Sequence, residues 1–126
     1  MKRTMWGSLI LLVLLIGGLV VSFGMRAVHS DICRLLQQAE AAAEGDDWQN
    51  AASLAKEARL AWEKHHAFTA SFADHNPMDE LDGLFAELMV FLQDRESPHF
   101  SATCARLAVL AKSMADSHGL QWWNVL

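Results

Sequence analysis

The six histidines are the residues whose type could do chemistry, since a neutral imidazole binds metal ions and carries protons near neutral pH. His65, His66 and His75 lie close together along the chain. On a helix, the turn from His65 to His75 would be about 280° beyond full circles, or about 80° the short way, and that from His66 to His75 about 180°, so neither pair shares a face. The sequence contains no His-x-x-x-His pair, and we therefore expect no metal or cofactor site.

Two of these histidines have simpler structural explanations. His65 falls on the apolar seam of a predicted helix, so we expect a core histidine that donates to a backbone carbonyl. His75 precedes Asn76-Pro77, and the residue before a proline is pushed out of the α region. We therefore expect His75 at a helix C-terminus, where the helix dipole favours a cation.

The carboxylates and cysteines form no catalytic arrangement either. Glu63 next to Lys64 and His66 indicates a solvated face, and no nucleophile motif or glycine-rich phosphate loop is recognisable. In an antiparallel bundle Cys33 and Cys104 would differ in height by about 10 Å. That exceeds the separation of roughly 7 Å that a disulfide allows. We predict two free thiols and a protein that is not an enzyme.

Residues 5–25 form an uncharged apolar run, and the rest of the chain is tethered to it. Its length as a helix, about 30 Å, matches the hydrocarbon core of a bilayer. Lys2 and Arg3 precede it, so the positive-inside rule predicts a cytoplasmic N-terminus and an extracytoplasmic domain in the cell membrane. A cleaved signal peptide is the alternative, with Ser22-Phe23-Gly24 as its best site, although its apolar region would usually be shorter.

The apolar run also carries a small-xxx-small pair, Gly18 and Ser22. Such pairs let two membrane helices approach closely, so a homodimer through this face is one expected partnership. Glycine is also common in membrane helices without that role.

The remaining residues are acidic. All 15 Asp and Glu follow residue 25, together with 8 of the 10 Lys and Arg. We expect no nucleic-acid partner for such an acidic domain, because proteins bind the nucleic-acid backbone through Lys and Arg, which replace its counterions. It also disfavours docking of the domain on anionic lipid.

Apolar residues recur with helical period from Val28 onward, and turn residues fall only at three junctions. We predict an all-α fold: an N-terminal transmembrane helix followed by a four-helix antiparallel bundle built from two hairpins. The predicted divisions are a cytoplasmic N-terminus (1–4), an anchor (5–25), a helical domain (26–119) and a tail (120–126). The second bundle helix has a seam spaced alternately by three and four: Trp48, Ala51, Ala55, Ala58, Trp62, His65, Thr69 and Phe72.

Cap residues predict where these helices begin and end. The expected ends are Gly45 as a left-handed C′ residue, Asn76-Pro77 and Gly119, and the expected starts are Asp46 or Asp47, Asp79, and Ser97 as an N-cap. A second helix reaching His75 would be about 42 Å long, against about 26 Å for the first. We therefore expect it to bend or to end near residues 67–72.

The first hairpin turn, Ala-Glu-Gly-Asp-Asp-Trp-Gln-Asn-Ala, is like the interior of a tetratricopeptide hairpin. Each hairpin places an aromatic residue early in its second helix, Trp48 and Phe100, which suggests a faint internal repeat. A single copy without a 34-residue period does not predict a repeat array.

Several short motifs carry a resemblance to a known family. They are Trp62-Glu63-Lys64-His65, His75, Met78-Asp79, the Gly45-Asp46-Asp47-Trp48 turn and the Asn124-Val125-Leu126 ending. With them the whole chain resembles domain of unknown function 4363, small proteins of spore-forming Firmicutes. The resemblance implies a single-pass bacterial membrane protein with no assigned activity, and a multi-pass membrane protein as a partner.

We expect a membrane-anchored interaction or structural module of the cell or spore envelope. The alternatives are a ligand-sensing extracytoplasmic domain and a secreted helical protein after signal cleavage. An even number of bundle helices returns the chain to the membrane, where tryptophan is enriched. The Trp122-Trp123 pair is therefore expected either at the lipid interface or against the base of the bundle. The candidate interaction or membrane-interface residues are Trp62, His65, Phe72, His75, Trp122 and Trp123.

Overall fold

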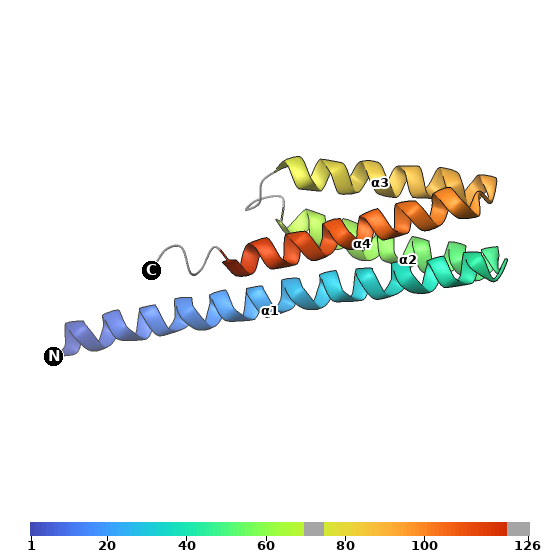
Figure 1. The fold of residues 1–126 in the computed structure, drawn as a ribbon. Coiled ribbons are helices and arrows are strands. Elements are labelled where there is room, and N and C mark those ends of the chain that lie inside the picture. The colour runs from blue at the N-terminus through green and yellow to red at the C-terminus, as the bar shows by residue number, and fades with distance from the viewer. Residues whose placement is uncertain (70–74, 121–126) are drawn as a thin grey trace.

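The computed structural model describes residues 1–69 and 75–120, and side chains within that part except those of residues 2, 3, 68, 69, 75, 76 and 117–120. Four helices run alternately up and down: α1 (Lys2–Glu44), α2 (Trp48–Thr69), α3 (His75–Asp94) and α4 (Ser97–Leu120) (Figure 1). No strand occurs in these described ranges. The predicted all-α fold with two helical hairpins is confirmed.

The predicted anchor and the first bundle helix are one continuous helix. α1 has 43 residues, about 64 Å at the usual rise, and its N-terminal half extends well beyond the other helices (Figure 1). Residues 25–27, Met-Arg-Ala, contain no proline or capping residue that would end a helix here. The orientation of the bundle is therefore fixed relative to the apolar half of α1.

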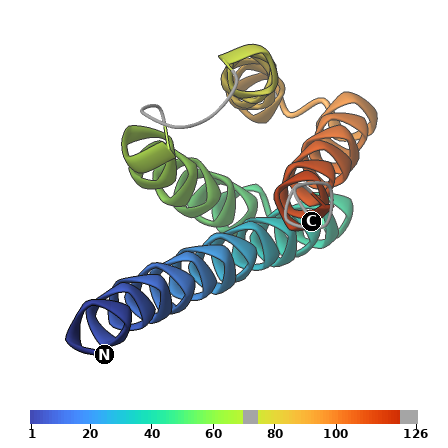
Figure 2. The ribbon, with the colours of Figure 1, turned by 90° about the vertical axis from the view of Figure 1, so that its left-hand side faces the viewer.

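The helices form a ring rather than a stack. α1 packs against both α2 and α4, α4 also packs against α3, and α2 and α3 contact each other over fewer residues. Figure 2 shows α3 on the opposite side of the bundle from α1, with α2 on one flank and α4 on the other. The last helix of the chain thus lies beside the first, and the α2–α3 side is the least closely packed.

The core follows the predicted seams. Ala51, Ala55 and Ala58 are fully buried in α2, and their small side chains let α2 approach α1 closely. Larger side chains fill the rest of the ring, and the buried ones of greatest volume are Trp62, Phe85 and Phe100. Among the described side chains, none before His29 is buried.

The turn between α1 and α2 differs from its prediction. Gly45 has φ −80°, and the left-handed residue is Asp46, with φ 59°. The N–H of Asp46 donates to Ala43 O at 3.1 Å and that of Asp47 to Ala42 O at 2.8 Å, which is the Schellman pattern with Asp46 at C′. The prediction of Gly45 at C′ is wrong by one residue, because aspartate also tolerates this conformation.

The turn between α3 and α4 repeats the same geometry. Arg95 has φ 54°, and the N–H of Glu96 donates to Phe91 O at 3.1 Å. The N–H of Phe100 donates to Glu96 O at 2.9 Å, so Glu96 rather than Ser97 is the N-cap. Trp48 and Phe100 are not at matching positions after these turns, but their rings meet edge to face at 5.7 Å.

The junction between α2 and α3 differs from the prediction for His75 but agrees with the predicted early end of α2. α2 ends at Thr69, inside the predicted window, while α3 already begins at His75. Asn76 and Pro77 therefore lie in the first turn of α3, where a proline loses no helix hydrogen bond. His75 stands at a helix N-terminus, so its prediction at a C-terminus is wrong.

Candidate functional site

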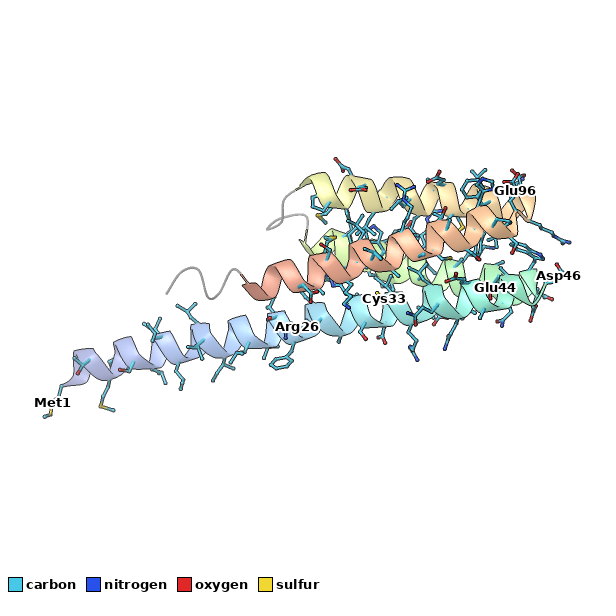
Figure 3. All side chains as sticks on the ribbon, in the orientation of Figure 1. Met1, Arg26, Cys33, Glu44, Asp46 and Glu96 are labelled. Carbon is cyan, nitrogen blue, oxygen red and sulfur yellow. The ribbon has the colours of Figure 1, made fainter. Side chains whose placement is uncertain are left out.

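The most exposed feature of the molecule is the apolar half of α1, residues 5–25, which we call the apolar segment. Every large apolar side chain from Met5 to Phe23 is at least 45% exposed. Figure 3 shows the N-terminal part of α1 running on beyond the other helices, with its side chains projecting from it. By length and composition the helix could cross a membrane, and none of its most apolar window is buried. Apart from the half-buried Gly18, Ser22 and Met25, this surface is exposed.

The end of the bundle nearest the apolar segment, which we call the base, is where α2 ends, α3 begins and α4 ends (Figure 1). His29 of α1 contacts His65 of α2, so Thr69, four residues on, is level with Met25, four residues back. Figure 3 places Arg26 at the base, below α4. The first charge after the apolar segment therefore marks the height of the base.

Two buried histidines meet at the base. His29 is 1% and His65 8% exposed, and their ring centroids lie 4.9 Å apart with the planes at 85°. Nδ1 of His29 lies 2.6 Å from Met25 O, and because a carbonyl only accepts, this nitrogen carries the proton. His65 is a core residue as predicted. Sequence reasoning missed His29, although it lies three residues before Ile32 on the same stripe.

A polar contact joins α2 to α3. Trp62 is 1% exposed, and its Nε1 donates to Oδ1 of Asp82 at 2.6 Å. The other carboxylate oxygen, Oδ2, lies 3.6 Å from Nε2 of His66. His66 is therefore turned toward α3 rather than sharing the solvated face predicted for Glu63. One carboxylate of α3 thus holds two aromatic side chains of α2.

A pocket of about 270 Å³ opens beside this contact. Its lining combines charged and aromatic side chains, namely Arg59, Trp62, Glu63, His66, Asp82 and Phe85. Nε of Arg59 donates to Oε1 of Glu63 at 3.0 Å, so both charges at this rim are paired within α2. The lining is largely polar, and among the residues that line the pocket there is no arrangement of nucleophile and base.

Both cysteines are free thiols, as predicted. Sγ of Cys33 donates to Ala108 O of α4 at 3.4 Å, and burial raises the pKa of this thiol. Cys104 is buried in the core, where burial, followed by the charge of Glu40, raises the pKa of its thiol to about 12. Neither thiol is therefore an activated nucleophile, since the thiolate is the reactive form.

The six predicted interaction residues do not form one site among the described residues. Trp62 and His65 are buried inside the bundle. His75 begins α3, while Phe72, Trp122 and Trp123 lie outside the described residues. Within the described side chains, no group of three His, Cys, Asp or Glu residues could hold a metal ion.

Comparison with known proteins assigns the chain to a family. The family model described as Domain of unknown function (DUF4363) matches residues 21–125, from the last turns of the apolar segment through the whole bundle. No curated protein and no solved structure matches the chain. The match covers most of the 126 residues, and the chain therefore belongs to the family of domain of unknown function 4363.

Proposed function

We propose that this protein is a membrane-anchored interaction or structural module of the cell or spore envelope, without catalytic activity. The observation that carries the proposal is the uncovered apolar segment, whose large side chains from Met5 to Phe23 are each at least 45% exposed. Burying an apolar side chain contributes about 1.5–3 kcal/mol. Transfer of this whole surface from water into lipid is accordingly worth on the order of 20 kcal/mol.

The orientation follows from the charges. Two positively charged side chains, Lys2 and Arg3, flank the start of the apolar segment, and one, Arg26, directly follows its end. The more positively charged flank stays in the cytoplasm. The bundle accordingly lies outside the inner leaflet, with its base at the membrane surface.

Fractionation and mass measurement test this proposal together. We expect full-length protein, starting at Met1, in the membrane pellet after carbonate extraction, and we expect Leu12→Arg to weaken its retention because a charge at the bilayer centre is costly. Glu57→Arg on an exposed face of α2 is the matched control. A soluble protein that begins near residue 24 would instead establish the secreted alternative, since the bundle core begins only at His29.

The partner is a second copy or a multi-pass membrane protein. In the described part of the bundle, polar side chains serve packing, as Asp82 does toward Trp62, which fits an interaction role better than a catalytic one. Crosslinking in intact membranes, followed by mild detergent extraction, tests it. Recovery of the protein as a monomer with no crosslinked neighbour would contradict the interaction role.

Ligand sensing is the second candidate, and the pocket of about 270 Å³ between α2 and α3 is the observation that favours it. A ligand there would contact Asp82 and Arg59 and stabilise the loosely packed side of the bundle. We expect a bound small molecule to raise the melting temperature, and this rise to be lost in Arg59→Ala. A panel of small acids, amines and zwitterions that leaves the melting temperature unchanged would remove this candidate.

A further inference from the structure

One stripe of the apolar segment is less exposed than the rest. Gly18, Ser22 and Met25 are half-buried, while every other described residue from Thr4 to Ala27 is exposed. At 100° per residue, Ser22 lies within about 20° of both His29 and Cys33 around α1. The stripe is therefore a direct continuation of the side of α1 that faces the bundle.

The register between α1 and α4 shows what lies over this stripe. Sγ of Cys33 contacts Ala108 O at 3.4 Å, and the two helices are antiparallel (Figure 1). Leu120, twelve residues after Ala108, is then level with Val21, twelve residues before Cys33. The end of α4 accordingly extends about 6 Å past the height of Met25, alongside the apolar segment.

The chain that follows α4 has the composition to continue along the same surface. Residues 121–126 carry no charged side chain, and four of the six are apolar, Trp122, Trp123, Val125 and Leu126. Six residues reach about 9 Å as a helix and about 20 Å when extended. Gly18 lies only three residues, about 4.5 Å, beyond the height of Val21, so it is within reach in either case.

We propose that the stripe Gly18–Ser22–Met25 is covered by this chain's own carboxyl-terminal segment, residues 117–126, in the outer half of the membrane. The inference rests on the proposed membrane anchoring. Small side chains on α1 let the segment approach closely. A second copy is the weaker occupant: Ser22 points the same way as His29, so a parallel partner helix on this side would collide with α2 and α4.

Cysteine crosslinking in membranes tests which occupant is present. In a full-length chain carrying Cys33→Ala and Cys104→Ala, we would introduce Ser22→Cys alone, or together with Leu120→Cys, and oxidise the membranes. The expected result is an intramolecular link in the double variant, identified by the mass of the joined peptides, and no dimer in the single variant. The matched control pairs Leu120→Cys with Val20→Cys, which is 66% exposed and points about 200° away from Ser22.

Two results would overturn the inference: disulfide-linked dimers through Ser22→Cys, which assign the stripe to a second copy, or equal linking by the Val20→Cys control. Absence of any link in protein that is helical and present in the membrane pellet also overturns it. Because that pellet is verified first, loss of the protein from it contradicts the anchoring proposal instead.

Removal of residues 121–126 gives a second readout. We expect the accessibility of a spin label on Ser22→Cys to molecular oxygen, which dissolves in lipid, to rise several-fold in the truncated chain, while that of a label on Val20→Cys stays unchanged. Equal accessibility of the label on Ser22→Cys with and without these residues would contradict coverage by the segment.

Discussion

The indole Nε1 of Trp62 lies 2.6 Å from Oδ1 of Asp82, and this hydrogen bond crosses the least closely packed side of the bundle. The tryptophan is buried while the carboxylate side chain is about half exposed, at 49%. Water therefore solvates the acceptor but not the donor. Loss of this hydrogen bond would therefore bury the indole N–H without an acceptor, whereas water would still solvate the carboxylate of Asp82.

Asp82→Ala should destabilise the bundle by about 1–3 kcal/mol, because it leaves a buried N–H group without its acceptor. Glu87→Ala on the same helix is the control, since Glu87 lies 4.0 Å from Arg106 in an exposed ion pair and such pairs contribute about 0–1 kcal/mol. Urea unfolding of the full-length protein in mild detergent measures both. Equal losses in the two variants would show that the indole has another acceptor.

Ala55→Leu should destabilise the fold by about 1–3 kcal/mol, because a larger side chain overfills the close contact between α1 and α2. Ala55 is 0% exposed. Ala105→Leu on the exposed side of α4 adds the same atoms outside the core, and we expect it to change stability by no more than about 0.5 kcal/mol. Thermal melts followed by circular dichroism compare them, and a tolerated Ala55→Leu would mean that α2 stands farther from α1.

Gly45→Ala should leave stability unchanged or raise it by about 0.4–1 kcal/mol, since alanine restricts the unfolded chain. Gly45 has φ −80°, and a Cβ there would meet only Ala41 O and Ala42 O at 3.6 Å. A clear loss of stability on chemical unfolding would instead restore Gly45 to the left-handed position.

Asp46→Ala should cost about 1–2 kcal/mol, because alanine is disfavoured at φ 59° and because Oδ1 of Asp46 accepts from Nε1 of Trp48 at 2.8 Å. Asp46→Asn keeps an oxygen acceptor and tolerates the same conformation, so it should retain the stability of the original chain. The ranking of the two variants by melting temperature checks the argument, and equal melting temperatures would contradict it.

The buried thiol of Cys104 should make the fold sensitive to high pH. Its pKa is raised from 9.0 to about 12 by burial, with a further increase from Glu40. Below pH 9 both states keep the proton, but between pH 9 and about 12 only the unfolded state releases it, so stability falls by up to about 1.4 kcal/mol per pH unit. Urea unfolding at several pH values should give a shallower decline for Cys104→Ala, and the same slope in both proteins would contradict the burial argument.

The sequence was informative where packing repeats along one helix. The alternating spacing that includes Ala51, Ala58 and Trp62 predicted the buried side of α2, because a helix turns the same face inward every three or four residues. The length mismatch between the first two bundle helices also predicted that α2 ends early, and it ends at Thr69. Both inferences depend on local geometry alone.

The features that sequence reasoning missed depend on which helices become neighbours. Asp82 is separated from Trp62 by twenty positions, and nothing local indicates that α3 brings its carboxylate to the indole. The contact of His29 with His65 depends in the same way on how α1 meets α2. The errors at Gly45 and His75 were of another kind: the chain had two acceptable residues or positions for one cap, and cap statistics do not choose between them.

The pairing of α1 with α4 has a consequence for how the chain acquires its structure during synthesis. The first helix to be synthesised needs α4 as a neighbour, so the ring of four helices closes only after α4 has been synthesised. Until then the inner side of α1, which includes Ile32 and Leu36, can pack against α2 but not against α4. A chain truncated before residue 97 would lack α4 and would leave this apolar surface exposed, and exposed apolar surface is what chaperones recognise.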